Sequence, residues 1–432
     1  MAELIRIIDR DQEAFIDELA RRKSDDLDEV LPVVAEIIGR VRREGDQALI
    51  DYTRRFDKVE LTAAQLKVDL EEIDGAVKLV DSPLQEALAH AFERLCSYHL
   101  RQLQNSWFVT GPDGEFLGQR IAPVDSAALY APGGKAAYPS SVLMAAAAAR
   151  TAGVNRVALF SPPDPGGALN PAVLFAAGLA GIDEIYRVGG AQAIAAAAYG
   201  TAAIPAVDVI AGPGNIYVTA AKKLVYGRVN IDMLAGPSEI VVIADDSANP
   251  AWVAADLLSQ AEHDERAGAL LVTVSRTLAR KVAVEVSKQL SSLPKKKIAG
   301  ESVKNFGAIL IARSTEHAAE LANRFAPEHL ELLVTDPWET FGLVRSAGAV
   351  FLGPLTPEAV GDYWAGPNHV LPTGGSARCF SPLGVHLFLK RTSVISYNRR
   401  AFDRAAGPVT VMARAEGLEA HARSMEIRNR KK

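Results

Sequence analysis

Two side chains near residue 260 could bind one metal ion together. Gln260 and His263 are three positions apart, in the run Gln260-Ala261-Glu262-His263-Asp264. On a helix this spacing places both side chains on one face, where an amide oxygen and an imidazole nitrogen can reach the same cation. The run lacks the H-E-x-x-H pattern of protease zinc helices, so that class is not supported. Taken alone, a surface glutamine and histidine in the last turn of a helix is the simpler interpretation.

Glu328 and His329 form a second candidate pair, between Pro327 and a predicted strand at residues 330–334. Imidazole has an ordinary pKa of about 6.5, which suits proton transfer near neutral pH. The neighbouring carboxylate could serve as a second base. A capping glutamate beside a polar histidine remains an open interpretation of the same two residues.

The densest polar loop covers residues 361–373, where Asp362, Asn368 and His369 are interleaved with glycine and proline. A loop of this composition contributes little to a core and offers many polar contacts. We therefore expect the loop to be functional.

A further histidine, His421, lies on a predicted C-terminal helix and could complete a metal shell of Gln260, His263 and Asp362. Such a shell has only nitrogen and oxygen ligands, which suits zinc and tolerates manganese or cobalt. For His421 alone, an exposed helical histidine is the simpler interpretation. Cys96 and Cys379, the two cysteines of the chain, are too few for a thiolate site and are expected to be buried.

Three glycine-rich turns follow predicted strands. They begin at Tyr130, Gly189 and Gly212, and the last is Gly212-Pro213-Gly214-Asn215. None matches the G-x-G-x-x-G fingerprint, so each alone could be a plain turn. Because ligands of α/β proteins bind beyond the carboxyl ends of strands, the three turns together make residues 127–235 the candidate nucleotide region.

The elements that must position these residues change in type along the chain. Residues 1–110 have helical periodicity, and after about residue 120 short apolar runs alternate with alanine-rich helical stretches. This alternation predicts an α/β protein with mainly parallel sheets. Residues 381–408 look irregular, and a final helix is expected at 409–428. The predicted strands are residues 127–130, 157–160, 184–188, 207–211, 239–244, 270–275, 308–312, 330–334 and 349–352.

Composition limits the classes of function. The 432 residues, 49% of them apolar, suggest two or three domains, and the net charge of −5 has no long basic or acidic block. We therefore expect no dedicated nucleic-acid surface. No apolar run is long enough for a membrane span and no secretion signal is visible, so we expect a cytoplasmic protein.

Several of these motifs, in this order, resemble the histidinol dehydrogenase family. The resemblance extends from about residue 30 to residue 428, nearly the full chain. The runs that carry it are Ala235-Gly236-Pro237-Ser238-Glu239, Ala255-Asp256-Leu257-Leu258-Ser259-Gln260-Ala261-Glu262-His263-Asp264, Ala326-Pro327-Glu328-His329-Leu330, residues 361–373 and Glu416-Gly417-Leu418-Glu419-Ala420-His421.

The resemblance implies a fold of two incomplete Rossmann-like domains, doubly wound, with small helical N- and C-terminal segments in an intertwined homodimer. We accordingly expect a segment at 1–25, a larger α/β domain at 26–125 with 238–380, an NAD-binding α/β domain at 126–237 and a C-terminal segment at 381–432 that docks on the partner subunit.

The resemblance also implies the ligands. Gln260, His263 and Asp362 of one subunit and His421 of the other would hold one zinc ion per subunit, and Tyr130, Gln192 and Asn215 would contact NAD. The implied contacts to the substrate L-histidinol are Ser238, Gln260, His263, His329, Asp362, His369, Glu416 and His421.

The implied reaction is the oxidation of L-histidinol to L-histidine through L-histidinal, the last step of histidine biosynthesis. His329 would accept the proton in each oxidation, and Glu328 would activate the water that adds to the aldehyde. Three alternatives remain: a related dehydrogenase for another small alcohol, a zinc protein without catalysis, and a metal-dependent hydrolase that needs no NAD.

Overall fold

The computed structural model describes residues 4–133 and 138–429, without the side chains of residues 20–26. The chain divides into two compact units: Met1–Gln102 with Val124–Phe388, and Leu103–Pro123 with Leu389–Lys432. No helix within the described ranges combines the length and apolar character needed to cross a membrane.

The first unit contains a six-stranded parallel sheet with the order β1-β11-β10-β9-β12-β13. Its four central strands are buried along their whole length, as expected for a parallel sheet covered on both faces. The strands are β1 (Arg6–Ile8), β9 (Glu239–Ala244), β10 (Gly268–Thr273), β11 (Gly307–Ile311), β12 (His329–Leu333) and β13 (Ala349–Leu352).

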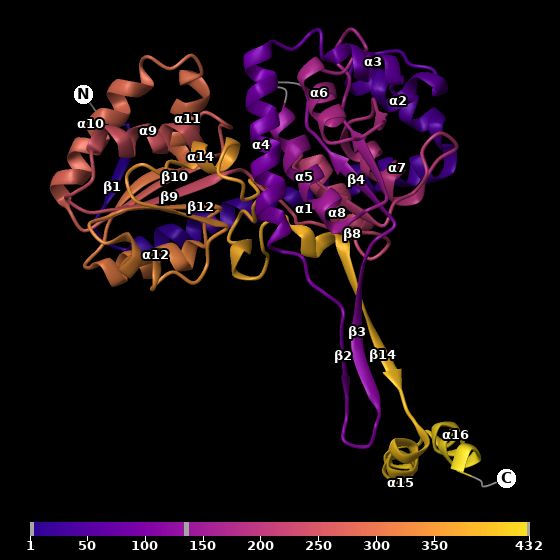
Figure 1. Cartoon of the computed structure of the whole chain (residues 1–432). Coiled ribbons are helices and arrows are strands. Elements are labelled where there is room, and N and C mark those ends of the chain that lie inside the picture. The colour runs from indigo at the N-terminus through magenta and orange to yellow at the C-terminus, as the bar shows by residue number, and fades with distance from the viewer. Residues whose placement is uncertain (1–3, 134–137, 430–432) are drawn as a thin grey trace. The chain divides into compact units, whose positions relative to one another are not determined.

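Helices lie on both faces of this sheet, as Figure 1 shows. One face packs against α9 (Pro250–Ala261), α10 (Arg276–Leu290) and α11 (Lys296–Phe306), and the other against α12 (Thr315–Phe325). The short helices α13 (Pro337–Phe341) and α14 (Glu358–Tyr363) follow β12 and β13.

The second parallel sheet of this unit has the order β6-β5-β4-β7-β8. Its strands are β4 (Ser126–Tyr130), β5 (Arg156–Phe160), β6 (Glu184–Tyr186), β7 (Val209–Ala211) and β8 (Asn230–Ile231). Its connecting helices are α5 (Pro139–Ala152), α6 (Pro171–Leu179), α7 (Gly190–Tyr199) and α8 (Ile216–Val225), rich in alanine that allows close packing. The α/β class is confirmed, and each of the nine predicted strands forms within two residues of its expected bounds.

The N-terminal part differs from its expectation in two ways. Residues 1–25 were expected to be helical. A helix does begin at Gln12, but β1 lies before it and pairs with β11 in the six-stranded sheet. Residues 26–125 were expected to belong with 238–380, but the apolar side chains of Val34, Leu49 and Tyr52 share a core with the five-stranded sheet. The helices that present such residues are α1 (Gln12–Glu44), α2 (Asp46–Phe56), α3 (Leu70–Ala76) and α4 (Ser82–Leu100).

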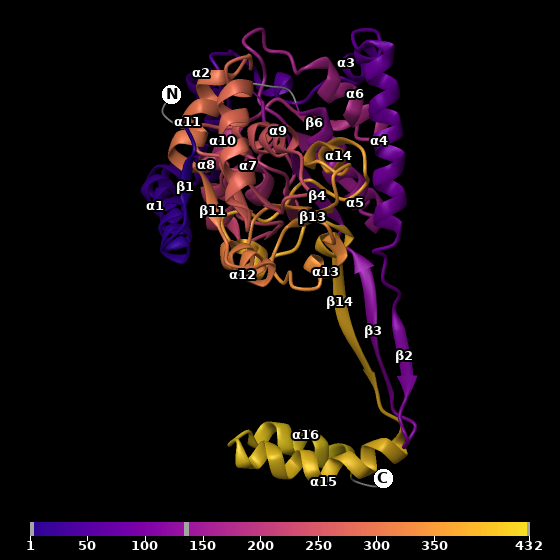
Figure 2. The same cartoon turned by 90° about the vertical axis from the view of Figure 1, so that its left-hand side faces the viewer.

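The second unit is an antiparallel sheet of β2 (Trp107–Thr110), β3 (Phe116–Pro123) and β14 (Leu389–Ser396), followed by α15 (Arg399–Ala415) and α16 (Glu419–Asn429). Figure 2 shows α15 and α16 lying side by side. Residues 381–408 were expected to be irregular, but part of this stretch forms β14. The single helix expected at 409–428 is interrupted near Gly417, because its φ of 74° does not continue a helix.

The two cysteines also depart from expectation. Cys96 is only half-buried and Cys379 is exposed, and both thiols are free. The prediction that both cysteines are buried in the core is therefore wrong.

Candidate active site

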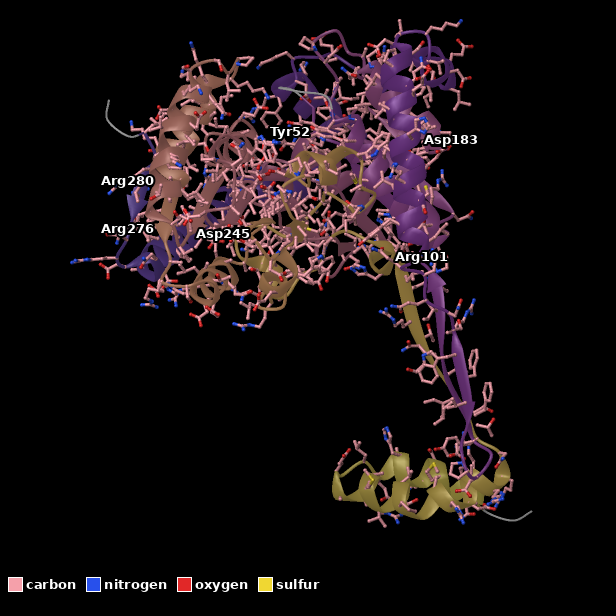
Figure 3. All side chains as sticks on the ribbon, turned by 60° about the vertical axis from the view of Figure 1, so that its left-hand side comes forward. Tyr52, Arg101, Asp183, Asp245, Arg276 and Arg280 are labelled. Atoms are coloured by element: carbon pink, nitrogen blue, oxygen red, sulfur yellow. The ribbon has the colours of Figure 1, made fainter. Side chains whose placement is uncertain are left out.

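The expected catalytic pair lies at the amino edge of the six-stranded sheet. His329 is the first residue of β12, and Glu239 is the first residue of the neighbouring strand β9. Asp245, labelled in Figure 3, lies beyond the carboxyl end of β9 at the opposite edge, where its carboxylate accepts hydrogen bonds of 2.8 Å from the Thr335 N–H and hydroxyl. The site therefore uses the edge that α/β proteins less often use.

His329 is buried and held in one tautomer. Its Nδ1 lies 3.1 Å from the carbonyl oxygen of Glu239, which can only accept, so Nδ1 carries the proton. Its Nε2 is buried without a hydrogen-bond partner among the described residues. Burial lowers the pKa of His329 to about 3, and the nearby His263 and His369 add to this effect. A neutral imidazole with an unused Nε2 lone pair can accept a proton.

Glu328 lies beside His329 and is also buried. Its Oε2 accepts a hydrogen bond of 3.0 Å from the Glu239 N–H and is 3.8 Å from His329 Nδ1. The backbone of Glu239 thus fixes both members of the pair at the start of β9.

The expected metal ligands of the first unit gather next to this pair. Gln260 is fully buried at the end of α9, and His263 follows in the turn after that helix. His263 and Asp362 belong to a group of three residues, with Glu358, whose ligand atoms all lie within 4.8 Å of one another. The Gln260 amide reaches the same group: one of its two end atoms is 3.1 Å from Glu358 Oε1, and the acceptors around that atom assign it as the nitrogen.

Glu358 was not predicted from the sequence. It begins α14 four residues before Asp362, so the two carboxyls share a helical face, and this spacing was the signal that could have revealed it.

Buried carboxyls crowd around this group. Burial raises the pKa of Asp362 to about 7. Burial also raises the pKa of Glu358 well above its ordinary value, with further contributions from the carboxyls of Asp362, Glu328, Glu331 and Asp256. Such crowding disfavours the ionised carboxyls, and a bound cation would relieve it.

The polar loop at 361–373 joins this site to the five-stranded sheet. The Nδ1 of His369 donates to the carbonyl oxygen of Asp362 at 3.0 Å, and its Nε2 lies 3.2 Å from the hydroxyl of Ser141 on α5. The Thr373 hydroxyl oxygen accepts the N–H of Gly236, two residues before Ser238. The expected substrate contact His369 is thereby tied to the candidate metal group, and Ser238 lies close in sequence to a residue that the same loop contacts.

The expected NAD contacts lie at the carboxyl edge of the five-stranded sheet. Tyr130 ends β4, and its hydroxyl oxygen accepts the Gly190 N–H at 3.0 Å; burial raises the pKa of Tyr130 to about 12. Gln192 is buried on α7, which follows β6, and Asn215 caps α8 after β7 with hydrogen bonds of 3.1 Å from two backbone N–H groups. Gly134 and Lys135 of the first glycine-rich turn lie outside the described residues.

A buried ion pair supports one of these turns. Lys222 on α8 is paired with Asp232, and both side chains are almost fully buried. Lys222 Nζ donates to the Gly212 carbonyl oxygen at 2.9 Å, and the Asp232 carboxylate accepts the Gly212 N–H at 2.8 Å. Both backbone groups of Gly212 are therefore fixed by this pair.

Two expected site residues belong to the other unit. Glu416 follows α15 and His421 lies on α16, and both side chains are exposed there. Their roles stay predictions.

Comparison with known proteins agrees with the resemblance. The family model described as histidinol dehydrogenase matches residues 20–429. The chain is 53% identical to the histidinol dehydrogenase of Synechococcus sp. over 99% of this chain and 96% of that protein, and 56% identical to that of Moorella thermoacetica over 91% and 93%. The crystal structure of histidinol dehydrogenase from Elizabethkingia anophelis matches with a TM-score of 0.88 and 38% identity, covering 92% of each chain. This chain therefore belongs to the histidinol dehydrogenase family.

Proposed function

We propose that this chain oxidises L-histidinol to L-histidine through L-histidinal, with NAD as the oxidant. The observation that carries the proposal is the buried Glu328–His329 pair beside the group of His263, Glu358 and Asp362, in a member of this family. A base next to a cation site suits a two-step alcohol oxidation, because the base can accept the proton while a cation holds the substrate and the aldehyde in place.

The residues present fit a zinc ion. Gln260, His263 and Asp362 offer amide, imidazole and carboxylate ligands, and buried carboxyls around them favour a cation. We propose that these three hold zinc, one ion per subunit, with His421 supplied by a second copy of the chain. When bound, zinc would coordinate the imidazole and amino nitrogens of the substrate and so orient the substrate.

His329 would act as the base in both oxidations. Its Nδ1 proton is engaged by the Glu239 carbonyl, so Nε2 is the atom that accepts the proton of the alcohol and later of the aldehyde hydrate. Glu328 would remove a proton from the water that adds to the aldehyde, since its carboxylate lies within 3.8 Å of His329.

Tyr130, Gln192 and Asn215 would contact NAD at the carboxyl edge of the five-stranded sheet, within a cofactor domain at 126–237. NAD would take one hydride in each oxidation. The loop contact of His369 with Ser141 joins this half to the metal group, which is consistent with a cofactor opposite the substrate. Ser238, His369 and Glu416 would add substrate contacts.

We further propose a homodimer with shared active sites, working in the cytoplasm. The second unit exposes large apolar side chains that a second copy could cover. These are Trp107, Phe108, Val109, Ile395, Val411 and Met412.

The test is the number of NADH molecules formed per L-histidinol consumed, with zinc added and then chelated. About two NADH, lost on chelation, would support the proposal, because each hydride needs one NAD. About one would mean that oxidation stops at the aldehyde and would remove the role of Glu328. The absence of any NADH would overturn the proposal. The enzyme would then act on another alcohol or be a hydrolase, and a hydrolase would be recognised by activity that needs no NAD.

A further inference from the structure

Glu358 is a buried carboxyl of the candidate site to which no role has been given above. It is 3% exposed, and its backbone N–H donates to Glu331 Oε1 at 2.7 Å. The position of the residue is thus fixed at the start of α14, while its side chain points into the group that contains His263 and Asp362.

The Glu358 side chain lies next to the amide of Gln260. The amide nitrogen is 3.1 Å from Glu358 Oε1, 3.2 Å from the Glu239 carbonyl oxygen and 3.0 Å from His329 Nδ1. The Glu239 carbonyl oxygen can only accept a hydrogen bond, so the NH₂ edge of the amide faces it and the neighbouring Glu358 Oε1. The amide oxygen, the atom that can bind a cation, is left on the other edge.

His329 Nδ1 is a competing neighbour of the same amide. As long as Nδ1 donates to the Glu239 carbonyl, it has no lone pair for a Gln260 hydrogen. The carbonyl has two lone pairs and can accept from both Nδ1 and one amide hydrogen. The second amide hydrogen then needs another acceptor, and Glu358 Oε1 is the one in reach.

We propose that Glu358 is a positioning residue that fixes the orientation of the Gln260 amide. In this orientation the amide oxygen stays available to the metal. The amide hydrogens do not compete for Nδ1 of His329, so His329 keeps the tautomer in which Nε2 can accept a proton. The inference rests on the proposed zinc-dependent function. It assigns Glu358 an action through Gln260 and not direct contact with metal or substrate.

The first variant is Glu358→Gln in the full chain, with zinc affinity measured by competition with a chelator of known affinity. Loss of a residue that hydrogen-bonds to a metal ligand usually lowers metal affinity by about 10–100-fold, and we expect a loss in that range. We also expect kcat to fall by a larger factor than the factor by which the KM for NAD changes. Glu358→Asp keeps the charge but shortens the reach, so it should lose at least about tenfold. Equal affinity in wild type and both variants would overturn the inference.

Two controls separate positioning from the alternatives. Glu331→Gln neutralises a carboxyl of the same cluster whose partners are the Glu358 backbone N–H and the Asp256 side chain, and it should change zinc affinity less than about threefold. A loss equal to that of Glu358→Gln would overturn the inference in favour of a general charge effect. In a Gln260→Ala background, Glu358→Gln should add less than about threefold, because the amide it acts on is gone.

An undiminished loss in the Gln260→Ala background would also overturn the inference, since Glu358 would then bind the metal itself. Thermal unfolding of each variant shows whether it folds, and Glu358→Asp remains informative if Glu358→Gln does not. If the wild type binds no zinc, the proposed function fails and this inference with it. If the wild type binds zinc and forms two NADH per histidinol while Glu358→Gln keeps its affinity, the inference alone fails.

Discussion

The two parallel sheets of the first unit carry their candidate sites at opposite edges. In the five-stranded sheet, Tyr130 and the turns after β6 and β7 lie at the carboxyl ends of the strands. In the six-stranded sheet, Glu328 and His329 lie at the amino end of β12, and α9 returns Gln260 to the same edge. The familiar rule of carboxyl-edge sites therefore describes one half of this chain and not the other.

The two edges also differ in electrostatics. The amino-edge site combines buried carboxyls of raised pKa with buried histidines of lowered pKa, a pattern typical of proton transfer and cation binding. The carboxyl edge of the five-stranded sheet offers backbone turns, a cap and the neutralised pair of Lys222 and Asp232. The difference supports the proposal that one edge performs the chemistry while the other recognises the cofactor by shape.

The largest expected effect tests the amino edge alone. His329→Asn should lower kcat by about 10²–10⁴-fold, because the general base is lost, with zinc affinity and the KM for NAD changed little. Steady-state kinetics and metal analysis check this. The exposed His90→Asn is the control and should be unaffected. A His329→Asn variant with the wild-type rate would remove this residue from the mechanism.

Lys222→Met tests the carboxyl edge of the other sheet. It leaves Asp232 buried without its cation, which should cost about 3–5 kcal/mol of unfolding free energy and raise the KM for NAD, with zinc affinity unchanged. Denaturant unfolding and NAD titration measure both. Lys223→Met, next in sequence, loses only a solvent-exposed pair with Asp28 and should cost less than about 1 kcal/mol. A comparable cost in both variants would contradict the assigned role of the pair.

Gly212→Ala should have a smaller effect at the same turn. A methyl group there would lie 2.2 Å from the Tyr130 carbonyl oxygen, on a residue with φ of +120°. Strain of this kind costs about 1–3 kcal/mol, and displacement of the turn should weaken NAD binding. Gly227→Ala is matched in its positive φ but has open space, so it reports backbone strain without the clash. If the two variants bind NAD equally well, the close approach to Tyr130 is irrelevant to the cofactor.

The smallest expected effect is a pH dependence near Tyr130. Burial raises the pKa of Asp57 to about 6, above the value of about 3.9 in an unfolded chain. The folded state therefore binds this proton more tightly, and stability falls as pH rises from about 4 to 6.

Asp57→Asn removes that loss, so its Tm should exceed that of the wild type at pH 8 and approach it below about pH 4. Thermal unfolding across this range is the measurement, with the exposed Glu60→Gln as the control. A Tm difference that does not vary with pH would contradict the raised pKa of Asp57 in the folded state.

Strands were predictable where they were buried on both faces. Nine of the eleven described strands of the two parallel sheets are short apolar runs and were found from the sequence. β1 and β8 were missed because strands of three and two residues show no periodicity. β2, β3 and β14 were missed because none of them is buried: β2 is short and exposed, and polar residues interrupt the apolar ones in β3 and β14. For the same reason the second unit was expected as helix and irregular chain.

The sequence by itself determined which residue types could do the chemistry: Gln260 with His263, Glu328 with His329, and Asp362 in its polar loop. Only the tertiary structure decided that these meet at the amino edge of β9 and β12, that Nε2 of His329 is the open nitrogen, and that Glu358 joins them. The reason is physical: a tautomer, a shifted pKa and an amide orientation depend on burial and on neighbours from distant parts of the chain, and packing alone brings those neighbours together.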